Sequence, residues 1–360
     1  MSRFTILHPQ TQAEFDRWDA FVMRHPQGRL YQLSWWLRCQ ERRFLRSGVV
    51  AVCRGETIVA GAACVRFGLS WSCANVTVVA NAPLVDADTP DSLAALLGGL
   101  VNDCRANGSL LLQLEAFEAG LEEPIRAYFG RRSVVHEPIW RIYSPGIWRE
   151  VHVPLAGRSE NDILNGVSQT VRYGIKKAQN AGIDVRQVFD EEGIRAAHAI
   201  WVESVAKHPY PIRSYHDFRR IVIESNQRGV GVLLLASIES EPAAFVFSIL
   251  FGCGAHWLHG GFTQKHAAVP CTRLLVWRTV QMAMSKGIPY LCLGGPSDRA
   301  RTGVQDFKDR WNPVLVDNQR FITVPLYPEL VRAAKPFISN PRVGVWIKKR
   351  IGGQARAVAK

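Results

Sequence analysis

The chain has 360 residues, of which 47% are hydrophobic and 21% charged. This length predicts two or three domains, and the composition excludes a mainly disordered chain. No apolar run reaches the ~18 residues of a membrane-spanning helix, and the amino-terminal segment lacks the apolar core of a signal peptide. We therefore expect a cytoplasmic protein, with contact to a membrane only at its inner face.

The charge of the chain is positive and unevenly spread. Forty-four basic and 31 acidic residues give a formal net charge of +13. Residues 1–150 are nearly neutral, whereas residues 328–360 carry eight basic residues against Glu329 alone. Such a field attracts phosphate in nucleic acid, in a nucleotide or in anionic lipid headgroups, and charge alone leaves these partners open.

The eight cysteines do not indicate a metal site or a disulfide framework. They form no CxxC pair, and none has a histidine partner at the spacing of a zinc motif. We expect most of them to be small buried apolar residues, and we predict no metal.

Two segments of the chain show the same order of predicted elements: strand, strand, strand, helix, strand. The first lies within residues 49–115 and its helix ends before Gly108. The second lies within residues 230–293 and its helix ends before Gly287. Glycine is favoured just beyond a helix end because it adopts positive φ. The pattern indicates either a repeated α/β unit or two unrelated α/β segments.

Antiparallel strands followed by a helix and a further strand predict a mixed sheet with helices across it, in an α/β (α+β) fold. We expect two domains, at residues 1–150 and 151–327, and then a basic helical tail at residues 328–360. A helix is also predicted over residues 160–181, capped by Ser159. Its apolar stripe consists of Ile163, Val167, Val171, Ile175 and Ala178.

Charged and aromatic residues on predicted helices allow two interpretations each. Arg172 and Lys176 lie one turn apart on the helix at 160–181, either as a solvated face or as a docking surface for phosphate oxygens. Trp35 and Trp36 lie next to several arginines, either as core residues or as a stacking surface for nucleic acid.

A second candidate site lies around residues 291–313. A buried strand runs into Gly294 and Gly295, where a backbone can approach a ligand closely. A polar loop and a short helix with Phe307 and Lys308 follow. Ligands of open α/β sheets bind at the carboxyl ends of strands, so this position favours a binding site, although turns use glycine in any case.

Histidine and tyrosine residues supply further candidates. His256 and His259 lie in a predicted strand, where positions three apart point to opposite faces, so we do not expect them to share a metal. His259 either lines a cleft or packs inside the protein. Tyr210, in the rigid loop HPYP, can donate a hydrogen bond into a site. Spacing alone assigns no catalytic triad.

Three stretches together resemble the FemABX family of peptidyl (aminoacyl) transferases: YQLSWW, VRYGIKKAQNAGIDV, and the block from HWLHGGF to GVQDFK. The family pattern is roughly an arginine, then IxKAxxxGxxV, and later KG, GG and GxxxFK. It is met here by Arg172, Ile175, Lys177, Ala178, Gly182, Val185, Lys286, Gly287, Gly294, Gly295, Gly303, Phe307 and Lys308. The resemblance implies two tandem GNAT-like domains, each with a mixed, mainly antiparallel sheet flanked by helices.

The resemblance also implies a function: an amino acid moves from aminoacyl-tRNA to the amine of a peptidoglycan precursor, without a metal or a covalent intermediate. We therefore expect no cofactor. Lys308 would neutralise the charge that develops on the reacting carbonyl, an effect of about a few kcal/mol in a dry cleft. Arg172 and Lys176 would hold phosphate of the acceptor or of the tRNA. Gln40 stands where the family pattern leads us to expect a lysine for the precursor's phosphate, which puts a peptidoglycan acceptor in question.

We therefore predict an acyl or aminoacyl transferase that acts on an amine of a peptide, sugar or cell-envelope precursor. Tyr210, His259, Gly294, Gly295 and Phe307 are candidate substrate-binding residues. One alternative uses acyl-CoA in exopolysaccharide or envelope assembly, although the loop GFTQKHAAVP lacks further glycines of a pyrophosphate loop. Another is a degenerate GNAT scaffold that binds RNA, or anionic membrane through its basic tail.

Overall fold

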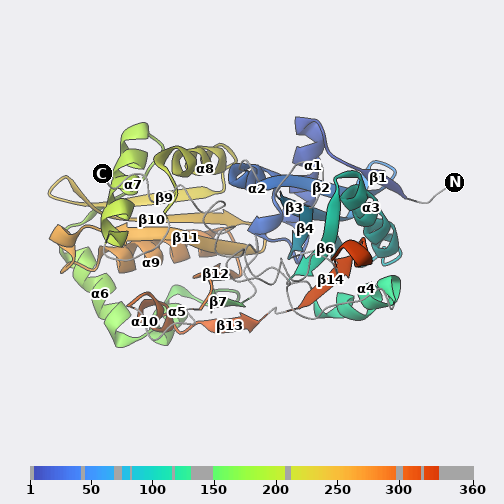
Figure 1. The fold of residues 1–360 in the computed structure, drawn as a ribbon. Coiled ribbons are helices and arrows are strands. Elements are labelled where there is room, and N and C mark those ends of the chain that lie inside the picture. Colours follow the sequence, from blue (N-terminus) through green and yellow to red (C-terminus); the bar gives the residue numbers. More distant parts are fainter. Residues whose placement is uncertain are drawn as a thin grey trace. The chain divides into compact units, whose positions relative to one another are not determined.

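Two compact units make up the chain, and each has its own sheet (Figure 1). The first unit contains Met1–Trp148 and a segment that begins at Asn318, and the second unit contains Arg149–Asp317. The computed structural model describes residues 4–41, 45–68, 75–81, 83–115, 118–130, 149–206, 212–296, 303–317 and 320–331. Within these ranges, no helix is both long enough and apolar enough to cross a membrane.

The sheet of the first unit has seven strands in the described part of the chain. Their order is β1-β2-β3-β4-β6-β14, and β5 pairs with β3. All pairs are antiparallel except β4 with β6. The strands are β1 (Thr5–Leu7), β2 (Leu45–Arg54), β3 (Thr57–Gly68), β4 (Asn75–Ala80), β5 (Leu84–Val85), β6 (Ser109–Glu115) and β14 (Phe321–Pro325).

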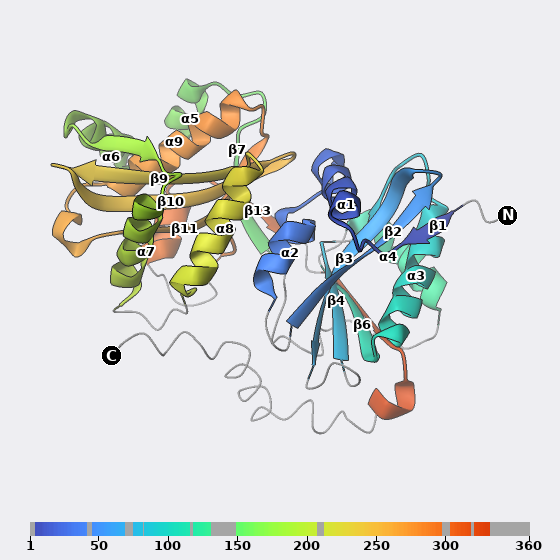
Figure 2. The same cartoon turned by 90° about the horizontal axis from the view of Figure 1, so that it is seen from above.

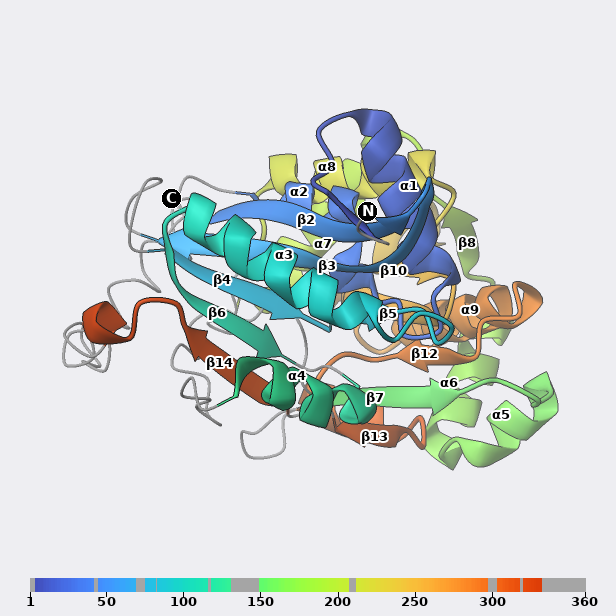
Figure 3. The ribbon, with the colours of Figure 1, turned by 90° about the vertical axis from the view of Figure 1, so that its right-hand side faces the viewer.

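Helices cover both faces of this first sheet. They are α1 (Gln12–Arg24), α2 (Ser34–Gln40), α3 (Ser92–Ala106) and α4 (Glu122–Phe129). Figure 3 shows α3 running across the sheet, and its leucines pack against Ala60 and Ala62 of β3. On the other face, a Cβ at Gly61 would lie 2.3 Å from the Trp18 ring of α1, so only glycine lets this helix pack so closely. Trp35 and Trp36 are buried, which confirms them as core residues.

The second sheet also has seven strands within the described ranges, in the order β13-β7-β12-β11-β10-β9-β8. Only β11 and β12 run parallel among its pairs. The strands are β7 (Arg149–Pro154), β8 (Asp184–Gln187), β9 (Gly231–Ile238), β10 (Glu241–Phe251), β11 (Gly254–Phe262), β12 (Tyr290–Cys292) and β13 (Val314–Asp317).

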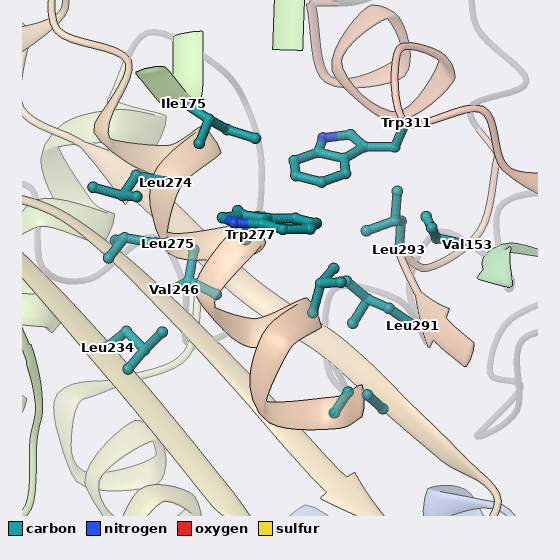
Figure 4. Close-up of a cluster of buried hydrophobic side chains, with 14 of the residues drawn as sticks. Val153, Ile175, Leu234, Val246, Leu274, Leu275, Trp277, Leu291, Leu293 and Trp311 are labelled. Atoms are coloured by element: carbon teal, nitrogen blue, oxygen red, sulfur yellow. The ribbon is translucent and has the colours of Figure 1, made fainter. Parts of the chain in front are cut away.

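The main core of the second unit lies between one face of this sheet and the helices on that face. The helices of the unit are α5 (Glu160–Gly166), α6 (Gln169–Asn180), α7 (Glu191–Val205), α8 (Tyr215–Gln227), α9 (Cys271–Ser285) and α10 (Gly303–Asp309). Helices α5, α6 and α9 contribute to this core, and Trp277 and Trp311 point into it (Figure 4). On the opposite face, Phe245 and Phe247 of β10 meet Phe218 of α8. Figure 2 shows α7 and α8 together on that face.

The predicted α/β fold with two mixed, mainly antiparallel sheets flanked by helices is confirmed. Helices α3 and α9 occupy corresponding places in the element order, and each is followed by a glycine at positive φ, +67° at Gly108 and +68° at Gly287. The turn between β2 and β3 contains Gly55 at φ +61°, and the corresponding turn between β9 and β10 uses Glu239 and Ser240 at φ +50° and +67°.

Two predicted boundaries are wrong. The helix expected over residues 160–181 is broken into α5 and α6 at Val167, which is extended. Gly166 disfavours helix, and the side chain of Ser168 accepts the Val171 N–H and so caps a new helix. The predicted capping by Ser159 is present.

The second correction concerns the domain limits. Strand β14 pairs with β6, so this part of the predicted domain at residues 151–327 belongs to the first sheet. The short, mainly apolar sequence of β14, FITVP, is compatible with either sheet, and only the pairing decides between them. Most of the predicted tail at residues 328–360, from residue 332 onward, lies outside the described residues.

Candidate functional site

The ammonium group of Lys308 lies beside the glycine pair that follows β12. Lys308 is on α10, and its Nζ donates a hydrogen bond to the Gly295 carbonyl oxygen at 2.7 Å. The residue is half-buried, and this burial lowers the pKa of the Lys308 ammonium, against an opposing effect of Cys292 and Asp309. A lysine has three N–H donors, so one contact to a carbonyl leaves donors for a second oxygen.

The backbone at Gly294 needs glycine. Its φ is +81°, in the left-handed region, and a Cβ built there would lie 3.6 Å from Lys308 Nζ. The Gly294 carbonyl accepts the Val151 N–H at 3.0 Å, which ties the turn to β7. The predicted combination of Gly294, Gly295 and Lys308 is thus brought together in the structure.

Phe307 has a packing role in this arrangement. Its ring lies 5.4 Å from the ring of Trp257 on β11 and 6.2 Å from that of Trp311, measured between centroids. These contacts hold α10 against the core of the second unit, and thereby fix the direction from which Lys308 reaches Gly295. A direct contact of Phe307 with substrate stays a prediction.

The two predicted phosphate contacts on α6 differ in their surroundings. The Nη1 atom of Arg172 donates to three carbonyls at or beyond the end of α5, those of Leu164 and Asn165 at 3.3 Å and that of Val167. Arg172, although exposed, therefore caps α5, and Lys176 is also exposed to solvent. The neighbouring Lys177 donates from Nζ to the Ala268 carbonyl at 3.3 Å, which ties α6 to the segment before α9.

Replacing Arg172 by alanine is expected to lower the free energy of unfolding by about 1 kcal/mol, because α5 loses a charged donor to its last carbonyls. Lys176→Ala is the matched control on the same helix and should change it by less than about 0.5 kcal/mol. Urea unfolding of both variants measures this difference. Equal stability of the two variants would remove the capping role of Arg172.

The side chains of His256 and His259 lie on the same face of the second sheet, and the predicted opposite orientation is wrong. The reason is a β-bulge between β10 and β11, where Phe247 pairs with His259 and the next residue, Ser248, pairs with Trp257. The bulge inserts one extra residue into β11, so that both imidazoles lie on the same face as Phe247. His256 stacks on Phe251, with ring centroids 5.9 Å apart.

His259 packs among aromatic rings. Its ring stacks on Trp201 of α7, with centroids 4.1 Å apart, and lies near Phe218 and Phe247. Desolvation, with a smaller effect of Arg213, lowers the pKa of His259 to about 3. His259 is on the opposite face of β11 from Trp257, the contact of Phe307. The other predicted contact, Tyr210, lies outside the described residues.

The lowered pKa of His259 predicts a loss of stability in acid. An unfolded histidine takes up a proton near pH 6.5, whereas His259 in the folded protein does so only near pH 3. Its contribution is therefore complete above about pH 6.5 and is lost as the pH falls toward 3, by at most about 1.4 kcal/mol per pH unit. The urea midpoint of the wild type should therefore fall relative to that of His259→Leu as the pH is lowered from about 7 to about 4. If the urea midpoints of the two proteins changed in parallel with pH, the lowered pKa of His259 would be contradicted.

The second unit contains a recognised domain. Residues 166–309 match the family model described as "Acetyltransferase (GNAT) domain", a range that includes Gly294, Gly295 and Lys308. A solved structure of FemX is similar to this chain with a TM-score of 0.78 at 14% identity, covering 91% of this chain and 100% of that chain. Residues 166–309 therefore form a GNAT-type acetyltransferase domain, and the chain as a whole has a FemX-like fold.

Other solved structures share this tandem GNAT fold. The C-terminal domain of a putative lysylphosphatidylglycerol synthetase from Agrobacterium fabrum has a TM-score of 0.57 at 12% identity, covering 96% of this chain and 99% of that chain. A tandem GNAT protein from the clavulanic acid biosynthesis pathway has a TM-score of 0.51 at 11% identity, covering 90% and 99%. No curated protein matches the sequence.

Beside the Gly294 turn, the GNAT-type unit buries a polar cluster that the sequence analysis missed. The His152 Nε2 atom is 2.8 Å from Oε2 of Glu150, and both residues are buried on β7. Burial and then the Glu150 carboxylate raise the pKa of the nearby Cys292 thiol well above its usual range. The alternation of polar and apolar residues in EVHV is the only sequence signal, because Cys292 follows 140 residues after His152.

Proposed function

We propose that this acyltransferase moves an aminoacyl or acyl group onto the amine of a peptide, sugar or cell-envelope precursor, with Lys308 as the catalytic residue. The observation that carries the proposal is the position of the Lys308 ammonium, half-buried and 2.7 Å from the carbonyl oxygen of Gly295. This position is at the carboxyl end of β12, where ligands of α/β sheets bind.

In the proposed reaction one negative charge develops, on the carbonyl oxygen of the donor, and the site must stabilise it. The acceptor amine attacks the carbonyl carbon of an ester or thioester, a C–N bond forms, and the carbonyl oxygen becomes an oxyanion. Lys308 then stabilises this oxyanion with its charge and a free N–H donor, which is stronger in a site with little water. When the oxyanion collapses, the C–O or C–S bond breaks and the leaving oxygen or sulfur takes the proton that the amine loses.

The start of α9 favours aminoacyl-tRNA over acyl-CoA as the donor. The first amides of this helix are those that a pyrophosphate would meet. The Cys271 N–H is bonded to the Val269 carbonyl at 2.8 Å, and the Arg273 N–H to the Pro270 carbonyl at 3.1 Å. Two donors that a CoA cradle would use are therefore already paired inside the chain.

The acyl-CoA alternative is supported by the family model, whose description names an acetyltransferase, and by the clavulanic acid pathway protein, whose description mentions AcCoA. The name of the lysylphosphatidylglycerol synthetase, in contrast, indicates an aminoacylated envelope lipid. The descriptions of proteins with this fold thus mention AcCoA in one case and a lysylated lipid in another. Lys176, with its exposed ammonium, is the proposed contact to a phosphate of the acceptor or the tRNA. That this protein acts at the inner face of a membrane stays a prediction.

A donor screen tests the proposed function. The full chain is incubated with radiolabelled aminoacyl-tRNAs or with acetyl-CoA, each with peptide, amino-sugar and lipid-headgroup amines as acceptors. We expect label to pass from tRNA to an amine, and a thermal shift with charged tRNA. Transfer from acetyl-CoA alone would establish the CoA alternative. Salt-sensitive RNA or vesicle binding without any transfer would replace both with the degenerate scaffold.

A further inference from the structure

Three side chains that can bind a metal, each of a different chemical kind, lie close together on one face of the second sheet. Glu150, His152 and Cys292 each offer one donor atom, and these atoms lie within 4.8 Å of one another. Glu150 and His152 are two positions apart on β7 and so share a face, and Cys292 of β12 pairs directly with His152. The three residues are 2%, 7% and 1% exposed.

The chemistry of this set fits zinc. Zn²⁺ binds thiolate, imidazole and carboxylate, and three protein ligands leave a fourth position for water or another ligand. In a tetrahedral zinc site, donor atoms lie roughly 3.3–3.8 Å apart. The cluster meets this spacing if the contact between His152 Nε2 and Glu150 Oε2, now 2.8 Å, opens slightly.

The surroundings already hold these ligands in place. The His152 ring stacks on Tyr290, with centroids 4.0 Å apart and planes 5° from parallel. The Gly294 N–H donates to Cys292 Sγ at 3.3 Å, a contact that also suits a metal-bound thiolate. Backbone bonds between β7 and the end of β12 fix both strands, since Leu293 N–H meets the Val151 carbonyl at 2.8 Å. Such outer contacts orient the ligands of metal sites.

Burial of a carboxylate, an imidazole and a thiol in one place carries a desolvation cost, which a divalent cation offsets by direct bonds. We propose that Glu150, His152 and Cys292 bind one zinc ion. On binding, Zn²⁺ replaces the thiol proton, which is released to solvent. Because the Gly294 N–H bonds to the ligand sulfur, the ion would anchor the turn that Lys308 contacts. A search for metal-binding motifs of short spacing does not find this site, because Cys292 is far from Glu150 and His152 in the sequence.

The test measures metal binding and not acyl or aminoacyl transfer, so its result is independent of the proposed function. The full chain, purified without a tag, is stripped with a chelator and titrated with Zn²⁺ or Co²⁺. We expect one tightly bound ion per chain and, with Co²⁺, a thiolate-to-cobalt charge-transfer band in the near ultraviolet. Cys292→Ser should abolish this band, and Cys292→Ser and His152→Gln should each weaken Zn²⁺ binding at least about 100-fold.

Cys271→Ser is the matched control, because Cys271 is also buried in the second unit but lies outside the cluster. It should bind metal as the wild type does. A wild type without the charge-transfer band, or a Cys292→Ser variant with wild-type affinity, overturns the proposal. If the variants do not fold, X-ray absorption of the zinc-loaded wild type decides: one sulfur with nitrogen and oxygen ligands is expected, and any other sulfur count refutes the site.

Discussion

Replacing Lys308 by alanine is expected to lower kcat about 100- to 1,000-fold, the loss seen when one donor to an oxyanion is removed. The effect should fall on kcat more than on KM, because the charge on the carbonyl oxygen develops only in the transition state. Lys308→Arg keeps the charge but not the point geometry of the ammonium, so it should recover only part of the rate. Steady-state kinetics with the donor found in the screen measure both variants.

The matched control for this prediction is Lys286→Ala. Lys286 also donates from Nζ to a glycine carbonyl, that of Gly229 at 3.4 Å, but it is exposed at the end of α9. Its loss should leave kcat within about twofold of the wild type, because Lys286 is exposed and its hydrogen bond goes to Gly229 and not to the Gly294–Gly295 turn. Circular dichroism checks the fold of all variants. A folded Lys308→Ala enzyme with wild-type turnover would end the catalytic assignment.

Trp311→Ala is expected to cause the largest loss of stability, about 3–5 kcal/mol. Trp311 is 1% exposed and follows α10, and its ring packs against Phe307 and the core of the second unit. Removal of the indole leaves a cavity that neighbouring side chains fill only in part. Because the same contact positions α10, the variant should also lose activity through misplacement of Lys308. Urea unfolding followed by circular dichroism measures the stability.

Two substitutions separate this packing effect from others. Trp311→Phe should cost much less, because it keeps an aromatic ring and removes a buried indole N–H that has no hydrogen-bond partner among the described residues. Tyr173→Ala removes another large ring, but one that is 67% exposed, and should change the free energy of unfolding by less than about 0.5 kcal/mol. A loss under 1 kcal/mol for Trp311→Ala would show that the core closes around the cavity.

Much of the local structure was predictable because its signals are short-range. Ser159 and Asp162 formed the capping box that their spacing indicated, and Gly108 and Gly287 end the helices that precede them. The break at Val167 was missed because an apolar stripe continues through it, although Gly166 and Ser168 carried the opposite signal. Strong periodicity therefore outweighed two correct local signals.

The candidate site was predictable only in part. The proximity of Lys308 to Gly294 and Gly295 followed from their order around a strand end and a short helix. The capping contact of Arg172 did not, because a helix face indicates which side chains are neighbours but not which carbonyls lie in reach. The orientation of His256 and His259 was wrong for a similar reason: a β-bulge changes the alternation, and it arises from pairing with a neighbouring strand.

The amino-acid sequence alone determined the α/β class, the repeated order of elements, and the grouping of Gly294 and Gly295 with Lys308. These features could be predicted because periodicity, caps and turns act over a few residues. The tertiary structure decided that β14 returns to the first sheet and that Glu150, His152 and Cys292 share one face of the second. These are pairings between segments up to about 200 residues apart. Such pairings depend on which strands align in space, a choice that local propensities do not encode.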